Sequence, residues 1–247
     1  MKVSANQLHE IHFYTRHMVS FNDPQRQPTR RSSLHIFART IGEAWLAISA
    51  RILETGINGS YDGVAMRELI LATLTIDEPN SVDEIIGRYA DPERLAWMHT
   101  NFTDYQRVSE LGGADSYATR LRDYDTSGRN QLHWVIEKLR SDPTTRSATI
   151  TTFQPLSDTT YIPCISLLDF FIIKDALELV VYAHSIDFGT KGYGNLVELA
   201  HLQAEVSEQL DVKVGTLTMI VKSAHVYVSE VTYMNNVVQS QKSHESP

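Results

Sequence analysis

The sequence predicts an α+β fold, in which a mixed or antiparallel β-sheet is flanked by helices. Helical spacing of apolar residues is common before residue 140, strand-like runs dominate residues 146–228, and a long amphipathic helix interrupts those runs. With 247 residues and 42% hydrophobic content, the chain can bury one substantial core. We therefore expect one domain over residues 1–247, with a variable segment at 1–37 and a frayed tail at 239–247.

The first half of the chain predicts a loop, two helices and a strand. Residues 20–33 are polar and rich in turn formers, which indicates a loop. A helix follows at 40–53, where apolar side chains recur at helical spacing. Residues 66–76 are rich in Leu, Ile and Thr and end in a turn, which is typical of a strand. A second helix is expected to open at Asp91 and Pro92, because Asp caps helices and Pro fits their first position.

The second half predicts a helix, a strand hairpin, a helix and a final strand. Apolar residues fall on one side of each helix and fill most of each strand. The runs on either side of Lys174 and Asp175 indicate a hairpin in a largely buried sheet. These elements are expected at residues 130–139, 167–173 with 177–182, 194–210 and 215–228.

Composition and charge exclude some classes of partner. The formal charge of -8 gives no general basic surface, so we expect no nucleic-acid partner, although a local basic pocket for a small phosphate is compatible with it. The N-terminus has no secretory pattern and no apolar run is long enough to span a bilayer. We expect a cytoplasmic protein with a reduced thiol and no membrane partner.

Cys164 is the only cysteine of the chain. A single thiol cannot form an internal disulfide or a thiolate metal cluster. From the residue alone, three interpretations stay open: Cys164 is a small buried side chain that fills the core, a residue without any particular role, or a nucleophile.

The polar residues that follow Cys164 form an ordered series. The series is Pro163-Cys164, His184-Ser185-Ile186-Asp187, Asn195 and Ser223-Ala224-His225-Val226-Tyr227. Its order and approximate spacing resemble those of the thymidylate synthase superfamily, which includes pyrimidine nucleotide hydroxymethylases. The resemblance covers residues 117–228, and a looser match over residues 38–102 looks most like the archaeal-type members.

The resemblance implies one-carbon chemistry on a pyrimidine nucleoside monophosphate. In that family a thiolate adds to C6 of the pyrimidine, and C5 then attacks the methylene of 5,10-methylenetetrahydrofolate or a related pterin. On this interpretation Cys164 is the nucleophile and no metal takes part. The resemblance also implies a symmetric homodimer.

The resemblance assigns the substrate contacts to four positions. Asn195 matches the amide that faces the pyrimidine edge and favours uracil, whereas the cytosine-selective hydroxymethylases have Asp there; helix capping is the alternative role. Ser185 matches the hydroxyl near the phosphate. His225 and Tyr227 share a strand face and match the pair that binds the sugar 3′-hydroxyl, although a polar pair under the core explains them too.

Further matches concern the pterin, the sulfur and the phosphate. Asp187 resembles the carboxylate that anchors the pterin ring, and Tyr117 the phenol near the catalytic sulfur. Arg146 resembles an arginine that reaches across the dimer to the partner's phosphate, but a solvent-facing strand residue is the alternative. Glu93 has a context similar to that of the proton-relaying glutamate, shifted by one position, and is equally well explained as a surface residue.

Some family positions are replaced in this chain. Ile165 stands where a His commonly follows the cysteine, Ser147 where a second arginine stands, and His184 where an arginine holds phosphate and lowers the thiol pKa. A protonated His184 would restore part of that charge. The other candidates for compensation are Arg120, Arg122 and the Arg30–Arg31 loop.

Three functions follow, in order of preference. The first is methylation of dUMP to dTMP. The second is hydroxymethylation of a uridylate or cytidylate, in which water captures the methylene intermediate. The third is a non-catalytic relative that binds a nucleotide.

Overall fold

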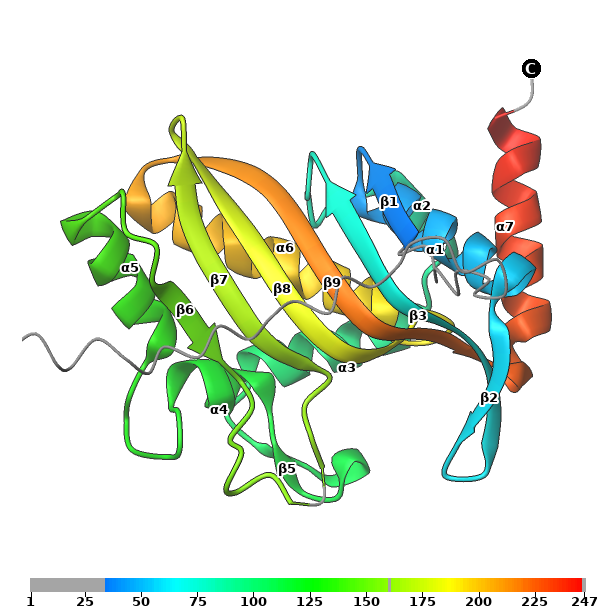
Figure 1. Cartoon of the computed structure of the whole chain (residues 1–247), viewed down its shortest axis with the longest axis horizontal. Helices are drawn as coiled ribbons and strands as arrows, with labels where there is room; N and C mark the ends of the chain where they lie inside the picture. The colour runs from blue at the N-terminus through cyan, green and yellow to red at the C-terminus, as the bar shows by residue number, and fades with distance from the viewer. Residues whose placement is uncertain (1–33, 160, 246–247) are drawn as a thin grey trace, which may run out of the picture. The chain divides into compact units, whose positions relative to one another are not determined.

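A seven-stranded mixed sheet lies at the centre of the fold (Figure 1). The computed structural model describes residues 34–159 and 161–245; the expected loop at 20–33, residues 1–33 of the expected variable segment, and the Arg30–Arg31 pair lie outside this part. The strand order is β1-β3-β9-β8-β7-β6, with β2 beside β3. The β1–β3 and β8–β9 pairs are parallel and the other pairs are antiparallel. The predicted α+β class is therefore confirmed.

The strands and helices have the following bounds. The sheet contains β1 (Leu34–Ala38), β2 (Ile57–Tyr61), β3 (Val64–Ile76), β6 (Ala148–Thr151), β7 (Ile165–Ile173), β8 (Ala176–Asp187) and β9 (Lys213–Tyr227), and a separate hairpin pairs β4 (Arg107–Val108) with β5 (Ala114–Asp115). The helices are α1 (Ile41–Thr55), α2 (Glu84–Tyr89), α3 (Pro92–Thr103), α4 (Tyr117–Arg122), α5 (Gln131–Ser141), α6 (Gly192–Leu210) and α7 (Val231–Glu245). Short 3-10 turns follow β4 and β9, at Ser109–Leu111 and Val228–Glu230.

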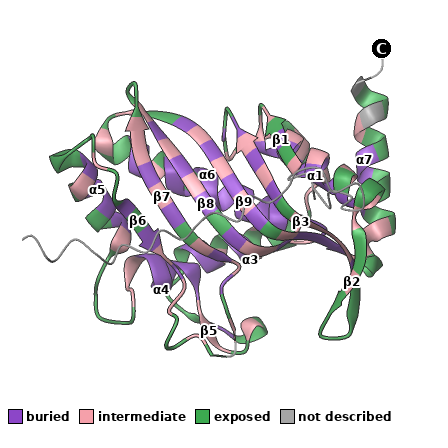
Figure 2. Cartoon of the chain, in the orientation of Figure 1, coloured by how far each residue is buried: buried purple, intermediate pink, exposed green. Residues whose placement is uncertain are grey.

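Burial alternates along the central strands, as the stripes in Figure 2 show. In β8, Leu177, Leu179 and Val181 are fully buried, and the residues between them are partly exposed. Successive side chains of a strand point to opposite faces, so one face packs into the core. Helices α1, α5 and α6 contact this sheet, and Figure 1 shows no described helix over the opposite face of β7, β8 and β9.

The predicted helix ends are confirmed by their caps. Thr40 and Glu43 form a reciprocal capping box before α1, and the Gly56 amide donates to the Ile52 carbonyl at its end. Asp91 caps α3, with Pro92 as its first residue. These side chains satisfy backbone amides that the first helical turn leaves without partners.

Helix α6 is held against the sheet by a buried amide. Nε2 of Gln203 donates to the carbonyls of Leu177, Gly215 and Thr216. The β8–β9 register shifts between Leu177 and Leu179, which leaves carbonyls there that the regular ladder does not pair. Gln203 therefore fixes α6 at the point where β8 and β9 begin to pair.

The C-terminal part corrects one expectation. Helix α7 continues to Glu245, so residues 239–245, which we expected to fray, are helical. Its Met234, Val237 and Val238 are buried and the helix packs beside α1. Tertiary packing thus stabilises a helix that its largely polar sequence does not predict. None of the described helices is both long and apolar enough to cross a bilayer.

Candidate active site

Cys164 lies half-buried immediately before β7. Its carbonyl accepts a hydrogen bond of 3.0 Å from the His184 amide, which fixes the cysteine loop to β8. Burial raises the pKa of the thiol, and the nearby Asp187 carboxylate raises it further. The charge of Lys191 and a hydrogen bond from the Tyr161 hydroxyl to the sulfur act in the opposite direction on this pKa. Both groups stabilise the thiolate, which is the nucleophilic form.

Tyr117 is the first residue of α4 and is buried beside the cysteine loop. Its hydroxyl oxygen accepts a 3.0 Å hydrogen bond from the Ile165 amide, and its own amide donates to Oδ1 of Asn101. Burial is the main cause that raises the pKa of Tyr117, and the charge of Cys164 is the next. The structure thus brings this phenol next to the sulfur.

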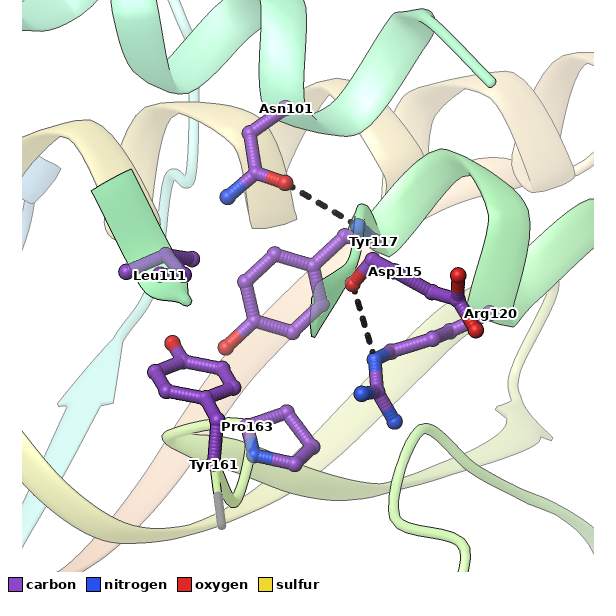
Figure 3. Close-up of a pocket in the computed structure, with 7 residues that line it drawn as sticks. All are labelled: Asn101, Leu111, Asp115, Tyr117, Arg120, Tyr161 and Pro163. Carbon is purple, nitrogen blue, oxygen red and sulfur yellow. Dashed lines mark hydrogen bonds between the residues drawn. The ribbon is translucent and has the colours of Figure 1, made fainter. Parts of the chain in front are cut away.

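A small hollow opens beside these groups (Figure 3). Figure 3 shows the phenol rings of Tyr117 and Tyr161 among the residues that line it. Tyr161 was not among the residues that the sequence suggested. Burial raises its pKa well above the ordinary value, so at neutral pH it keeps the proton that it donates to Cys164. The complete lining consists of Asn101, Leu111, Asp115, Tyr117, Arg120, Tyr161 and Pro163.

Two of the arginines that were candidates for phosphate binding are engaged within the fold. Arg120 is 3% exposed and forms a two-pronged ion pair with Asp158, with both N–O distances 2.8 Å. It also donates to the carbonyls of Asp115 and Thr152. Arg122 donates to the Phe102 carbonyl and to Glu205. Arg120 therefore does not compensate for the missing phosphate ligands, because it is buried and all three of its guanidinium nitrogens are engaged. Arg122 uses only two of its five N–H donors in these contacts, so its candidacy stays a prediction.

The ends of β8 and β9 place four polar residues on one face. Ser185 and Asp187 are two residues apart, as are His225 and Tyr227, so each pair shares a face. Oγ of Ser185 lies 3.5 Å from Nδ1 of His225, which brings the two pairs together. The rings of His225 and Tyr227 meet edge to face, with centroids 5.0 Å apart. Burial lowers the pKa of His225, which favours a neutral ring.

A side chain of β3, the strand on the other side of β9 from β8, also contacts this group of polar residues. Glu68 pairs with His225 across the β3–β9 ladder and accepts a 2.8 Å hydrogen bond from Ser223. The sequence did not single out Glu68, because the contact joins residues 155 positions apart.

Asp187 is the last residue of β8, and Asn195 lies in the first turn of α6, beyond the connection between the two elements. The Asp187 carboxylate accepts hydrogen bonds from the Gly189 amide and the Thr190 hydroxyl. Asn195 is 5% exposed, and its Nδ2 donates to the Lys191 carbonyl at 3.2 Å. The residue at the N-cap position of α6 is Lys191, so the alternative role of Asn195 as the helix cap is wrong.

Lys191 is the cation that sequence reasoning missed. Its Nζ lies 5.1 Å from the centroid of the Trp97 ring, in cation–π geometry. Among the charges acting on Cys164, that of Lys191 has the largest effect in lowering the thiol pKa. Its place between the matched residues Asp187 and Asn195 was the available signal.

His184 does not supply the positive charge that we considered for it. It is half-buried, and Nδ1 lies 3.5 Å from the Ser166 hydroxyl. Burial lowers the pKa of His184 and the charge of Lys222 lowers it further. The ring is therefore neutral at pH 7, and the expectation of a protonated His184 is not supported.

Glu93 and Arg146 occupy exposed positions. Glu93 is in the first turn of α3, where its amide donates to Asp91. Arg146 stands in an exposed bend before β6. No described residue around Cys164 hydrogen-bonds either side chain, so within one chain Glu93 fits its surface alternative.

Comparison with known proteins gives a consistent result. The thymidylate synthase family model matches residues 82–247. A protein of Methanococcoides burtonii named "Putative thymidylate synthase" is 34% identical over 200 residues, which cover 78% of this chain and 88% of that protein. A protein of Methanosarcina barkeri with the same name is 31% identical over 210 residues, which cover 82% and 93%.

A phage protein is also similar over a shorter region. The "Deoxyuridylate hydroxymethyltransferase" of Bacillus phage SP01 is 35% identical over 129 residues, which cover 46% of this chain and 33% of the phage protein. The family model covers about two thirds of this chain, including Cys164 and all of the residues brought together around it at the ends of β8 and β9. The chain belongs to the thymidylate synthase family.

Proposed function

We propose that this protein transfers a one-carbon unit to C5 of a pyrimidine nucleoside monophosphate, and that the reaction is methylation of dUMP to dTMP. The observation that carries the proposal is the half-buried Cys164 thiol, whose pKa is lowered by the charge of Lys191 and by a hydrogen bond from the Tyr161 hydroxyl against the effect of burial. A thiol that served only as core filler would need neither a cation nor a hydroxyl donor.

Members of this family bind a pyrimidine nucleotide and use methylenetetrahydrofolate as a co-substrate. The thiol of Cys164 first loses its proton, and the thiolate then forms a bond to C6 as the C5–C6 double bond opens toward C5. C5 then forms a bond to the methylene carbon as one carbon–nitrogen bond of the folate breaks, and loss of the C5 proton follows with the breaking of the second such bond. Hydride or water adds to the exocyclic methylene carbon, and the bond from sulfur to C6 breaks, which regenerates the Cys164 thiolate. The bound folate supplies the methylene carbon and, for a methyl product, the hydride.

The substrate contacts in this proposal are those that the family resemblance assigns to the polar side chains. Asn195 offers an amide that donates and accepts, which suits N3–H and O4 of uracil. His225 and Tyr227 face the sugar, and Ser185 the phosphate. Arg146 of the partner subunit completes the phosphate site in this proposal.

Asp187 fits the pterin ring. A carboxylate has about four acceptor positions, and Gly189 and Thr190 use two of them. The remaining lone pairs are able to accept N–H groups of a pterin.

A homodimer through the open face of the sheet is part of the proposal. Leu167 and Tyr182 are each 37% exposed there and are register neighbours, and Ile220 is the next neighbour of Tyr182 in β9. An apolar row across three strands is costly to leave in water and suits a second copy of the same surface.

Hydroxymethylation is the second candidate. It is favoured by the similarity to the phage hydroxymethyltransferase over 129 residues. The two reactions share Cys164 and differ in whether hydride or water captures the methylene carbon.

The test uses purified protein with methylenetetrahydrofolate and dUMP that carries tritium at C5. We expect tritium release from the wild type and none from Cys164→Ala. Mass spectrometry then separates a methyl from a hydroxymethyl product. If dUMP, UMP, dCMP and CMP all keep their tritium, both enzymatic functions are excluded for these substrates and the non-catalytic alternative stands.

A further inference from the structure

Two histidines and a buried glutamate form a cluster between α3 and α6. His99 lies on α3, whereas Glu198 and His201 lie three residues apart on α6. Nδ1 of His99 is 3.1 Å from Oε1 of Glu198, and Nδ1 of His201 is 3.4 Å from the same oxygen. Residues three apart on a helix project from the same side, so the E-x-x-H spacing presents both α6 side chains to α3.

The cluster borders a hollow of about 220 Å³. The Glu198 side chain is only 5% exposed, whereas those of His99 and His201 are 57% and 48% exposed. Buried carboxylates in proteins are paired with cations or coordinate metals. The two imidazoles therefore stand between a buried anionic oxygen and an open, solvent-accessible space.

We propose that His99, Glu198 and His201 bind a divalent transition-metal ion, with zinc as the occupant. Imidazole nitrogen and carboxylate oxygen are established ligand types for zinc, with bonds of about 2.0–2.2 Å. Tetrahedral coordination at these lengths separates the ligand atoms by about 3.4 Å. One ligand atom from each of the three side chains lies within 4.8 Å of the other two. Small rotations of the two exposed imidazoles therefore bring the three ligand atoms to the separation that a tetrahedral zinc ion needs.

The protonation of the ligands is compatible with binding. Each neutral imidazole presents the Nδ1 lone pair to the metal and keeps its single proton on Nε2. The Glu198 carboxylate supplies one negative charge, and water completes the coordination on the side of the hollow. The guanidinium that lines the hollow, that of Arg122, is paired with Glu205 there, which reduces its repulsion of a cation.

This site is separate from the proposed one-carbon transfer, which uses no metal. It joins two helices that both contribute to the active site: α3 carries Trp97 beneath Lys191, and α6 carries Asn195 one turn before Glu198. A bound ion therefore crosslinks α3 to α6 and stabilises the folded chain by an amount that grows with the logarithm of the free ion concentration once that concentration exceeds Kd.

The test is a cobalt and zinc titration of the full chain after chelator treatment. Cobalt(II) is the spectroscopic probe, and all proteins carry Cys164→Ser so that the thiol contributes no ligand. We expect one cobalt ion per chain with visible absorption bands that zinc displaces. Single changes His99→Ala or His201→Ala are expected to weaken binding at least tenfold, and the double change to abolish the bands.

His133→Ala is the matched control, since His133 is also an exposed helical histidine and lies on α5. It is expected to bind cobalt as the parent protein does. Circular dichroism of each variant checks that it is folded. The proposal is overturned if the parent protein shows no cobalt bands at 100-fold molar excess of the ion, or if the double variant keeps them. Either result would leave a histidine–glutamate hydrogen-bonded pair as the whole role of the cluster.

Discussion

The ammonium group of Lys191 lies over the ring of Trp97, with Nζ 5.1 Å from the ring centroid. This contact holds a flexible side chain at the start of α6, where its charge acts on the Cys164 thiol. In the family resemblance, the charge that lowers the thiol pKa comes from an arginine at the position of His184. We infer that in this chain Lys191 has taken over that electrostatic role from another element of the fold.

Removal of the Lys191 charge is expected to change the pH dependence of catalysis. Burial already raises the pKa of Cys164, so kcat/KM rises with pH as the thiol loses its proton. Lys191→Met raises the thiol pKa further and moves this rise to higher pH, so that kcat/KM at pH 7 falls about tenfold if the thiol pKa rises by about one. The measurement is kcat/KM for dUMP between pH 6 and pH 10. Lys138→Met is the control, because Lys138 forms the same kind of pair with Trp134 on α5; an equal displacement of the pH profile in both variants would contradict the prediction.

The Tyr117 hydroxyl is expected to contribute to stability through the cysteine loop. Tyr117→Phe leaves the buried Ile165 amide without its acceptor, and an unpaired buried donor costs about 1–3 kcal/mol. Urea unfolding of the two proteins measures this difference. Tyr105→Phe, at a tyrosine that is 59% exposed, is expected to change the free energy of unfolding by less than about 0.5 kcal/mol. Equal effects of the two changes would exclude the role assigned to the Ile165 hydrogen bond.

Arg120 is expected to act on stability and not on phosphate binding. Arg120→Met leaves the buried Asp158 carboxylate unpaired, which costs about 3–5 kcal/mol in the free energy of unfolding. The double variant Arg120→Met with Asp158→Leu is expected to recover most of this loss, because no buried charge then lacks a partner. Arg146→Ala is the contrasting variant. Arg146→Ala should keep the wild-type free energy of unfolding and raise KM for dUMP. Wild-type stability with a raised KM in Arg120→Met, together with lost stability and an unchanged KM in Arg146→Ala, would refute the structural role of Arg120.

Asn195 is expected to determine the choice between uracil and cytosine. Asn195→Asp replaces the Nδ2 donor by a carboxylate oxygen, so the side chain no longer donates to the Lys191 carbonyl or to O4 of uracil. We expect kcat/KM for dUMP to fall by about tenfold or more, since loss of a hydrogen-bond partner in a polar site discriminates strongly. Tritium release from dUMP and dCMP measures the ratio. An unchanged ratio would show that this amide does not contact the pyrimidine.

The open face of the sheet is expected to hold the dimer together. Tyr182→Glu introduces a charge between Leu167 and Ile220 in the apolar row, and burial of an unpaired charge opposes association. Sedimentation velocity should show a dimer for the wild type and a monomer for the variant. Tyr105→Glu is the surface control and should stay dimeric. A wild-type monomer at micromolar concentration would remove the basis for a phosphate contact from Arg146 of the partner subunit.

Helices and strands with local signals could be predicted from the sequence. Asp91 and Pro92 mark the start of α3, because the cap and the amides that it binds all lie between residues 91 and 94. Apolar periodicity marks α1 and α6. The six-residue helix α4 gives too few turns for a period to be recognised. Helix α7 was missed because its stability comes from contacts with α1, which is distant in sequence.

The candidate site shows the same division between local and distant signals. Cys164, Asp187 and Asn195 could be found because a family pattern specifies their order. Lys191 had only its place between Asp187 and Asn195 as a signal, because its effect depends on a ring 94 positions earlier in the chain and on a sulfur that it influences only after folding. Arg120 was misjudged for the same reason, since its partner Asp158 is 38 positions away.

Gln203 determines where Asn195 stands along the direction of α6. The two residues are eight positions apart on one continuous helix, which corresponds to about 12 Å along its axis. The three carbonyls that bind Gln203 therefore fix the position of α6 along its own axis, and the continuous helix carries that position to the Asn195 amide. In the proposed function, the precision with which Asn195 meets the pyrimidine is therefore set by a buried amide about two turns farther along the same helix, where α6 packs on the start of β8 and β9.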